Sequence, residues 1–336
     1  MAQLHVGTYA GSGGRGLVPV SLGEDGSLAA GEPFASAANA SFAASGNGLV
    51  YAVDEAEEGA INVLRREGEG WERFARVTSG GAAPCYVTLS PDGRLLAVAN
   101  YESGSAALYP LDADGLPQSP PAVFRNVGSG PDPERQEGPH IHCARFAPEG
   151  TGLFLVDLGT DQVLCLDLTD DGFGEASVAW TAPDGSGPRH LLLHPTLPRA
   201  LVLSELAATL TLLQRGPLGF ETLDRQPTAP TACKGENLGG HLCVNPARTR
   251  AYVSNRGHDS LAVFALVNGS LECLQHVPSG GRHPRHFALL EAERTLVVAH
   301  EKDGMVASFD IEADGRLRAT GHAITIPGAC FVLASE

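Results

Sequence analysis

The feature that most constrains the fold is a phrase that recurs along the whole chain. Each copy has an apolar run, a short turn, a second apolar run and a closing polar residue, as in the segment 84–100. The turn prolines of four copies, Pro91, Pro148, Pro195 and Pro246, recur about every 50 residues. A propeller blade of four strands takes about 40 to 50 residues, so the period predicts blades.

Each blade needs two more strands after the recurring phrase. Third apolar stretches follow several copies, and three of these stretches lead into turns rich in Asp and Gly, at 112–115, 170–172 and 312–315. Such turns suit hairpins between a third and a fourth strand. The six internal copies lie at 39–55, 84–100, 140–157, 188–205, 239–256 and 284–301.

The two ends of the chain supply a seventh copy. Residues 327–333 read as an innermost strand, while 4–9 and 17–20 read as further strands of the same blade. Strands from both termini in one blade would close the ring and remove a free sheet edge. The sequence therefore predicts an all-β, seven-bladed β-propeller, a single domain over residues 1–336 whose ring is closed by strands from both termini.

Charge and composition exclude several classes of protein. The formal net charge is −16, and Lys234 and Lys302 are the only lysines, so no basic tract exists to neutralise a nucleic-acid backbone. No run of 18 apolar residues predicts a membrane helix, and the first residues lack the pattern of a signal peptide. Seven cysteines without a C-x-x-C pair fit reduced thiols. We expect a cytoplasmic protein that binds neither nucleic acid nor membrane.

Histidine, arginine and carboxylate side chains gather at one end of the predicted blades. In an antiparallel blade the start of the first strand and the end of the second strand lie at the same rim, and first strands line the central channel. The two longest connections, 125–139 and 225–239, enter that rim and could form a lid. The residues at this rim are His140, His142, Arg189, His190, His241, Arg285 and His286 from strand starts, and Asn100, Asp157, Glu205, Arg256 and Glu301 from strand ends.

Each of these residues also has a structural interpretation. Arg189 could pair with an acid of a neighbouring blade, and Glu205 could be a solvated loop carboxylate. Asn100, Asp157 and Glu301 are interpreted as structural rim residues. His140 and His142 suit a metal by their spacing, yet further ligands are not evident, so we predict no metal and no cofactor. The run 11–16 matches G-x-G-x-x-G, but no helix follows it, which argues against a dinucleotide site.

Several phrases together resemble a known family. They are Pro139-His-Ile-His142, Gly187-Pro-Arg-His190 with Ser204-Glu-Leu206, the run 252–260, and His283-Pro-Arg285. The chain resembles, over essentially its whole length, the seven-bladed lactonases that include cycloisomerase-type 6-phosphogluconolactonases; fungal carboxymuconate lactonizing enzymes are related to them.

The resemblance implies a function and a set of site residues. It implies metal-independent hydrolysis of 6-phospho-D-glucono-1,5-lactone in the pentose phosphate pathway, with His142, Arg189, Glu205 and Arg285 in the pocket. Where relatives usually carry an acid, this chain has Gly240-His241, which leaves the substrate in doubt. We expect the remaining rim residues to bind substrate: His140, His190, His241, Arg256 and His286.

The chemistry of lactone opening suits these side chains. Water must lose a proton to a base while a cation or donor holds the developing oxyanion. Either His142 or Glu205 could be the base, with Arg189 as the oxyanion partner. The guanidinium groups of Arg256 and Arg285 would attract an anionic lactone even though the net charge of the protein is negative. The alternatives are a muconate-type lactonizing cycloisomerase and a non-catalytic interaction platform. The sequence leaves open the true lactone, whether His140 and His142 bind a metal, and whether the chain is a monomer or a homo-oligomer.

Overall fold

The computed structural model describes residues 2–334 except 69, 218, 291 and 293. Within these residues the chain forms seven antiparallel sheets of four strands each, together with one short 3-10 helix at Ala10–Ser12. Across the described part of the chain, no helix has the length and apolar character needed to cross a membrane. The number and size of the sheets are those predicted from the repeat.

The chain divides into two compact units, which are described separately. Unit 1 comprises Met1–Ala40, Ala207–Leu212 and Leu223–Glu336, and unit 2 comprises Ser41–Leu206 and Leu213–Thr222. One sheet, β16-β17-β18-β19, has residues in both ranges. Its strands are β16 (Pro188–Leu193), β17 (Arg199–Ser204), β18 (Thr209–Gly216) and β19 (Gly219–Pro227). That the whole chain is a single domain stays a prediction.

Unit 2 contains three complete sheets in which consecutive strands pair. The first consists of β4 (Ala43–Gly46), β5 (Leu49–Asp54), β6 (Ala60–Glu67) and β7 (Gly70–Thr78). The second consists of β8 (Pro84–Leu89), β9 (Leu95–Asn100), β10 (Ser105–Pro110) and β11 (Ala122–Arg125). The third consists of β12 (Ile141–Phe146), β13 (Gly152–Asp157), β14 (Gln162–Thr169) and β15 (Gly172–Thr181).

Unit 1 contains the remaining three sheets. One consists of β20 (Leu238–Val244), β21 (Arg250–Arg256), β22 (Ser260–Val267) and β23 (Ser270–Pro278). The next consists of β24 (Pro284–Leu290), β25 (Thr295–His300), β26 (Met305–Ile311) and β27 (Leu317–Thr325). The last consists of β28 (Ala329–Ala334), β1 (Ala2–Thr8), β2 (Leu17–Leu22) and β3 (Leu28–Ala30).

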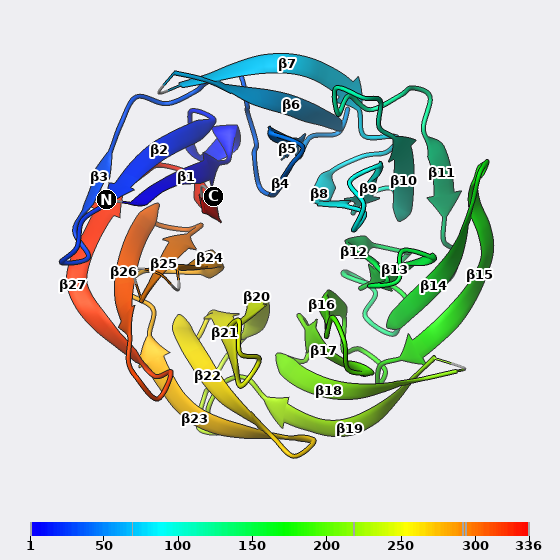
Figure 1. The fold of residues 1–336 in the computed structure, drawn as a ribbon. Helices are drawn as coiled ribbons and strands as arrows, with labels where there is room; N and C mark the ends of the chain where they lie inside the picture. The colour runs from blue at the N-terminus through cyan, green and yellow to red at the C-terminus, as the bar shows by residue number, and fades with distance from the viewer. Residues whose placement is uncertain (1, 69, 218, 291, 293, 335–336) are drawn as a thin grey trace. The chain divides into compact units, whose positions relative to one another are not determined.

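The sheet built from both ends of the chain confirms the predicted terminal blade. Strand β28 pairs antiparallel with β1, with Val332 opposite Val6, and β1 pairs with β2. In Figure 1 the labelled N and C ends lie beside β1 and β2. Side chains of both ends are buried in one apolar cluster with residues of β25 and β26. The last strand is therefore an integral part of the core of unit 1.

The burial pattern explains why the apolar runs of inner strands lack strict alternation of apolar and polar residues. All six residues of β13 are buried, whereas most residues of the fourth strand β15 are exposed. A strand covered on both faces needs apolar side chains in both directions, and an outer strand needs them in one. In unit 2 a large apolar cluster includes Tyr86 and Phe154 of inner strands together with Trp180 of the outer strand β15.

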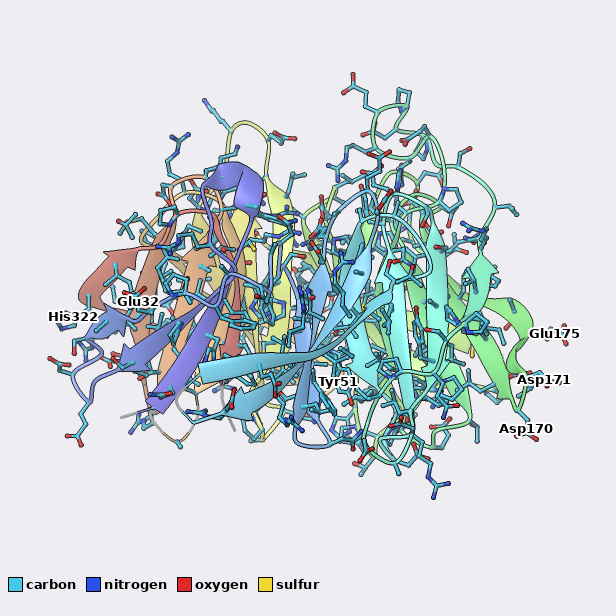
Figure 2. The ribbon with its side chains drawn as sticks, turned by 90° about the horizontal axis from the view of Figure 1, so that it is seen from above. Glu32, Tyr51, Asp170, Asp171, Glu175 and His322 are labelled. Carbon is cyan, nitrogen blue, oxygen red and sulfur yellow. The ribbon has the colours of Figure 1, made fainter. Side chains whose placement is uncertain are left out.

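The turns rich in Pro, Asp and Gly are plain connections, as predicted. In the first of them Gly93 has a φ of 69°, a left-handed conformation that glycine adopts without strain, and its N–H donates to Ser90 O over 2.9 Å. Figure 2 shows Asp170, Asp171 and Glu175 at the outer end of the hairpin between β14 and β15. The Asp112–Gly115 turn differs from the prediction, because β11 begins only at Ala122.

Candidate active site

A β-bulge at the start of β12 places His142. Ile141 pairs with Asp157 and Cys143 pairs with Val156, so His142 is the extra residue of the innermost strand. A bulge breaks the strict alternation of side chains and re-aims the residue it contains. His142 is only 4% exposed, so the re-aimed side chain is buried within the protein.

The next sheet repeats the same bulge and places Arg189. Pro188 pairs with Ser204 and His190 pairs with Leu203, so Arg189 is the extra residue of β16. Glu205 follows directly after the end of β17, and its backbone N–H donates to Gly187 O. The spacing of 16 residues between Arg189 and Glu205 thus places both at one end of a single strand pair.

The three side chains meet in a buried cluster. The Arg189 NH1 atom contacts both His142 Nε2 and Glu205 Oε2, and none of the three residues is more than 4% exposed. Guanidinium groups only donate, so His142 Nε2 is the acceptor in its contact with Arg189. The imidazole is therefore neutral with its proton on Nδ1. The alternative that Glu205 is a solvated loop carboxylate is wrong.

Two residues of this cluster escaped the sequence analysis. Arg135 NH2 donates to Glu205 Oε1 over 2.7 Å and to the Tyr101 hydroxyl over 3.3 Å. Burial opposes the charge on Arg135, but the Glu205 carboxylate outweighs burial and raises the pKa of the guanidinium. Glu205 lies between two cations, which keeps its carboxylate ionised.

Aromatic and imidazole rings form a wall beside these charges. The Tyr101 ring stacks on His140 with centroids 4.5 Å apart and meets His142 edge-on at 5.6 Å. His142 in turn meets His190 edge-on at 5.5 Å, and His190 meets Tyr86 at 5.6 Å. All five rings come from unit 2. These contacts pack the imidazole rings of the cluster against aromatic neighbours and hold them in place.

The pair His140 and His142 is split between different partners. His140 Nε2 lies 3.1 Å from Glu137 Oε1, and its Nδ1 lies 3.1 Å from Tyr101 O, while His142 contacts Arg189. Among the residues that the structure describes, no three His, Cys, Asp or Glu side chains are grouped so as to hold a metal ion.

Asp157 is a structural rim residue, as predicted. Its carboxylate accepts hydrogen bonds from the backbone N–H groups of His140, Gly159 and Thr160 and from Asn126 Nδ2, at 2.7 to 3.2 Å. Burial dominates its titration and raises the pKa of Asp157. The residue fastens the start of β12 and so supports the strand that carries His142.

A second Arg–Glu pair occupies the equivalent positions in unit 1. Arg285 is the bulged residue of β24, because Pro284 pairs with His300 and His286 pairs with Ala299. Arg285 NH1 lies 3.8 Å from Glu301 Oε2, and its guanidinium lies 5.2 Å from the ring centre of Tyr9. Sequence reasoning missed Tyr9, which lies between strands without apolar periodicity.

Glu301 is strongly stabilised in its charged form. Burial alone would raise its pKa, yet the hydrogen bond from His283 and the charges of Arg285 and Arg256 lower the pKa of Glu301 to about 2. His283 Nδ1 lies 3.1 Å from Glu301 Oε2. Arg256 NH2 donates to Gly239 O over 2.7 Å. The interpretation of Glu301 as a mere rim residue therefore misses its pairing with Arg285.

The rings of the predicted residues His241 and His286 lie against each other in unit 1, tilted by 33°. Their ring centres are 3.8 Å apart, and Phe331 lies 4.4 Å from His286. The backbone N–H of Val332 donates to His286 Nδ1 over 3.3 Å, which places the ring proton of a neutral His286 on Nε2.

The strand register corrects one sequence interpretation. The sequence analysis groups Asn100 and Asp157 with Glu205 as residues at the ends of second strands. In the structure, Asn100 and Asp157 each pair with the first residue of the innermost strand, and the residues that do so in two other sheets are Ser204 and His300. The residue after each of these positions is the one comparable with Glu205. Tyr101 is therefore the equivalent of Glu205 in the sheet of β8 to β11, which explains why it joins the cluster.

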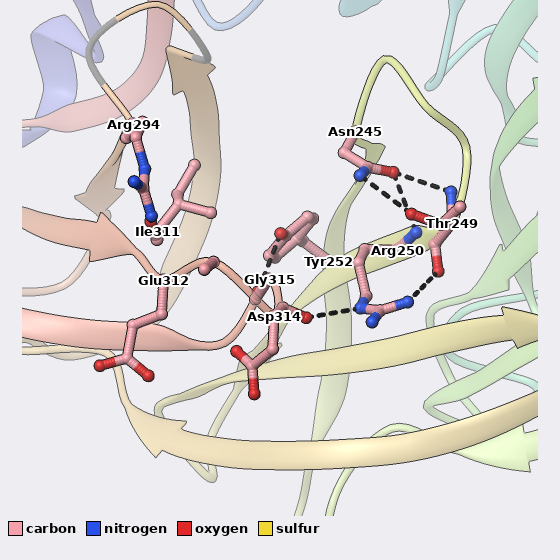
Figure 3. Close-up of a pocket in the computed structure, with 10 residues that line it drawn as sticks. Asn245, Thr249, Arg250, Tyr252, Arg294, Ile311, Glu312, Asp314 and Gly315 are labelled. Carbon is pink, nitrogen blue, oxygen red and sulfur yellow. Dashed lines mark hydrogen bonds between the residues drawn. The ribbon is translucent and has the colours of Figure 1, made fainter.

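A cavity of about 300 Å³ in unit 1 is lined mainly by residues of turns and by none of the predicted site residues (Figure 3). Its arginines are engaged by backbone carbonyls: Arg250 Nε donates to Asp314 O over 2.8 Å and Arg294 NH2 to Ile311 O over 3.0 Å. The Tyr252 hydroxyl donates to Gly315 O. These contacts fasten turns, and we place no chemistry there.

Comparison with known proteins agrees with the fold. The sequence model described as Lactonase, 7-bladed beta-propeller matches residues 3–334. The chain belongs to this lactonase family. The predicted seven-bladed β-propeller fold and the family resemblance are thereby confirmed.

Individual lactonase relatives extend over nearly the whole chain. The 6-phosphogluconolactonase of Bacillus subtilis is 31% identical over 335 residues, 96% of this chain and 95% of its own length. A crystal structure of a Lactobacillus plantarum protein has a TM-score of 0.91 at 28% identity, covering 100% of this chain and 99% of its own. The periplasmic gluconolactonase PpgL of Pseudomonas aeruginosa has a TM-score of 0.87 at 25% identity, covering 99% of each chain.

At the level of the family, the prediction of a 6-phosphogluconolactonase-like enzyme is confirmed. The predicted site residues fall into two sets within this lactonase chain. Unit 2 holds His140, His142, Arg189, His190 and Glu205, and unit 1 holds His241, Arg256, Arg285 and His286. The roles of both sets stay predictions.

Proposed function

We propose that this protein hydrolyses a sugar lactone, most specifically 6-phospho-D-glucono-1,5-lactone, with water and the side chains of unit 2. The observation that carries the proposal is the contact of Arg189 NH1 with both His142 Nε2 and Glu205 Oε2 in a buried cluster. It supports the proposal because a neutral imidazole, a fixed cation and a carboxylate are the groups that lactone hydrolysis needs.

The first step is attack of water on the lactone carbonyl carbon. His142 Nε2 takes a proton from the water, since the neighbouring guanidinium disfavours a proton on the imidazole before substrate arrives. Arg189 NH1 shifts its donor from His142 Nε2 to the carbonyl oxygen as negative charge develops there. This shift frees the imidazole lone pair at the moment when it is needed.

The second step is collapse of the tetrahedral intermediate. The oxyanion re-forms the carbonyl, the bond between the carbonyl carbon and the ring oxygen breaks, and the ring oxygen takes the proton from His142. The product is a hydroxy acid that ionises to a carboxylate, and His142 returns to its neutral form. Water and the lactone are the only reactants, and His142 is regenerated.

Glu205 orients the water and fixes Arg189 in this scheme. A carboxylate between Arg135 and Arg189 is a weak base, because each cation favours its ionised form. It remains a strong hydrogen-bond acceptor for a water proton. His140 and His190 are proposed to contact the substrate in unit 2. The substrate-binding roles of Arg256, Arg285, His241 and His286 of unit 1 stay predictions that variants of unit 1 test separately.

The substrate proposal rests on the relatives. The Bacillus subtilis relative is a 6-phosphogluconolactonase and the Pseudomonas aeruginosa relative is a gluconolactonase. A phosphorylated lactone would place the protein in the oxidative pentose phosphate pathway. The cytoplasm is the location proposed here, although the Pseudomonas relative is periplasmic.

A panel of lactones tests the proposal. Opening of 6-phospho-D-glucono-1,5-lactone, D-glucono-1,5-lactone and a muconolactone is followed by proton release, with spontaneous hydrolysis subtracted. We expect enzymatic opening of a gluconolactone and none of the muconolactone. Opening of the muconolactone alone would favour the cycloisomerase alternative, and no opening of any lactone would contradict the proposal.

A further inference from the structure

Arg135 comes from the connection 126–140, which is a fixed element. The Asp132 carboxylate accepts hydrogen bonds from the backbone N–H groups of Glu134 and Arg135, at 2.9 and 3.1 Å. Gln136 is completely buried, and its Nε2 donates to Leu158 O over 2.8 Å. The backbone around Arg135 is thus fastened to the sheet of β12 to β15, so its side chain is presented from a defined position.

The guanidinium of Arg135 uses one of its three nitrogens. NH2 contacts both Glu205 Oε1 and the Tyr101 hydroxyl. Within the described residues, neither Nε nor NH1 of Arg135 has an acceptor. The side chain is 34% exposed, against 5% for Arg189. Donors on Arg135 are therefore available at the open side of a buried reactive cluster.

Two guanidinium groups share the Glu205 carboxylate. Glu205 carries one negative charge and is shared by Arg135 and Arg189. Among the described groups, Glu205 is the one carboxylate that raises the pKa of Arg135. The remaining donors of Arg135, on Nε and NH1, form a planar fork that matches the oxygens of a phosphate group.

We infer that Arg135 is the residue of unit 2 that recognises the phosphate of the substrate and so selects a phosphorylated lactone over its neutral analogue. The inference rests on the proposed lactonase function. In this arrangement NH2 stays on Glu205 while Nε and NH1 face the phosphate oxygens. Substrate binding and the orientation of Glu205 are then coupled through one side chain.

The test compares two lactones on matched variants. Arg135→Gln removes the fork, and Arg215→Gln is the control, because Arg215 is 32% exposed and pairs with Glu149 in the same unit. The ratio of kcat/KM for 6-phospho-D-glucono-1,5-lactone to that for D-glucono-1,5-lactone should fall about 10- to 100-fold in Arg135→Gln. It should stay at the wild-type value in Arg215→Gln. An unchanged ratio in Arg135→Gln, including an equal loss on both lactones, overturns the inference.

A binding measurement separates the inference from the proposed function. Calorimetric titration with 6-phosphogluconate and with gluconate requires no turnover. We expect the wild type to bind 6-phosphogluconate more tightly, and Arg135→Gln to lose that preference. If Arg135→Gln loses the preference for 6-phosphogluconate but the wild type opens no lactone, the proposed function is contradicted and the phosphate site is supported. A wild type without the preference, or a variant that retains it, overturns the inference.

Discussion

Arg189 and His142 occupy the same bulge position in successive sheets, and the Arg189 guanidinium donates to His142 Nε2. Each is the extra residue at the start of an innermost strand. The repeated bulge therefore brings side chains that lie 47 residues apart in sequence into one buried hydrogen bond. This relationship predicts how activity depends on pH.

The acidic limb of the pH profile should depend on His142. An imidazole base is silenced by protonation, which for an ordinary histidine occurs near about pH 6.5. We expect kcat/KM of the wild type to fall as pH decreases, and the residual activity of His142→Asn to lack that limb. Activity should be measured from pH 5 to 8 with the spontaneous rate subtracted. An identical acidic limb in His142→Asn would assign the base to another group.

His300 should make unit 1 sensitive to mild acid. The residue is fully buried, its Nδ1 lies 2.8 Å from Met305 O, and burial lowers its pKa. Below about pH 6.5, His300 binds a proton in the unfolded chain but not in the native state. The free energy of unfolding therefore falls as pH decreases below that value, by up to about 1.4 kcal/mol per pH unit.

The variant that tests this prediction replaces His300 with asparagine. Asparagine is the natural residue at the positions equivalent to His300 in two other sheets, Asn100 and Asn255. Between pH 7.5 and 5.0, urea unfolding of His300→Asn should show a smaller loss of stability than the wild type. His322→Asn is the control, since His322 is 43% exposed (Figure 2). Equal losses in wild type and His300→Asn would contradict the assignment.

The last strand should be required for stability. Deleting residues 328–336 removes the buried side chains of β28 and leaves the ladder groups of β1 unpaired. We expect the melting temperature to fall sharply or cooperative unfolding to be lost, as followed by circular dichroism. A truncated chain that melts like the parent would show that the terminal blade does not depend on β28.

Replacing Arg285 with lysine tests the charged pair of unit 1. Lysine keeps the charge and loses the planar fork, so KM for the lactone should rise about 10-fold while the fold survives. Steady-state kinetics and circular dichroism provide the two readings, with Arg256→Lys as a second variant. Wild-type KM in both variants would remove these arginines from the substrate site.

The fold was largely readable from the sequence, because strand burial imposes periodic apolar runs. The innermost strand predicted to begin near residue 188 begins there, and the one expected near 328 begins at Ala329. The fine register was not readable. A bulge adds one residue to a strand but leaves the run of apolar residues recognisable. That Asn100 and Ser204 occupy equivalent positions in their sheets is seen only from the strand pairing in the structure.

The site was predictable where its residues border periodic strands, as His142, Arg189 and Glu205 do. Arg135 lies in a connection between β11 and β12, where no periodicity marks it. Its role depends on a contact with Glu205 across 70 residues of sequence. Such contacts arise from the way connections cover strand ends, and local patterns carry no signal for them.

The most direct test of the account is the rate at which Glu205→Gln opens 6-phospho-D-glucono-1,5-lactone. Glu149→Gln is the matched control, because Glu149 forms an Arg–Glu pair in the same unit. Loss of a carboxylate that orients water and fixes Arg189 should lower kcat at least about 100-fold, or roughly 3 kcal/mol. The control should retain the wild-type rate. A Glu205→Gln protein that is folded and opens the lactone as fast as the control would contradict the assignment of this cluster as the active site.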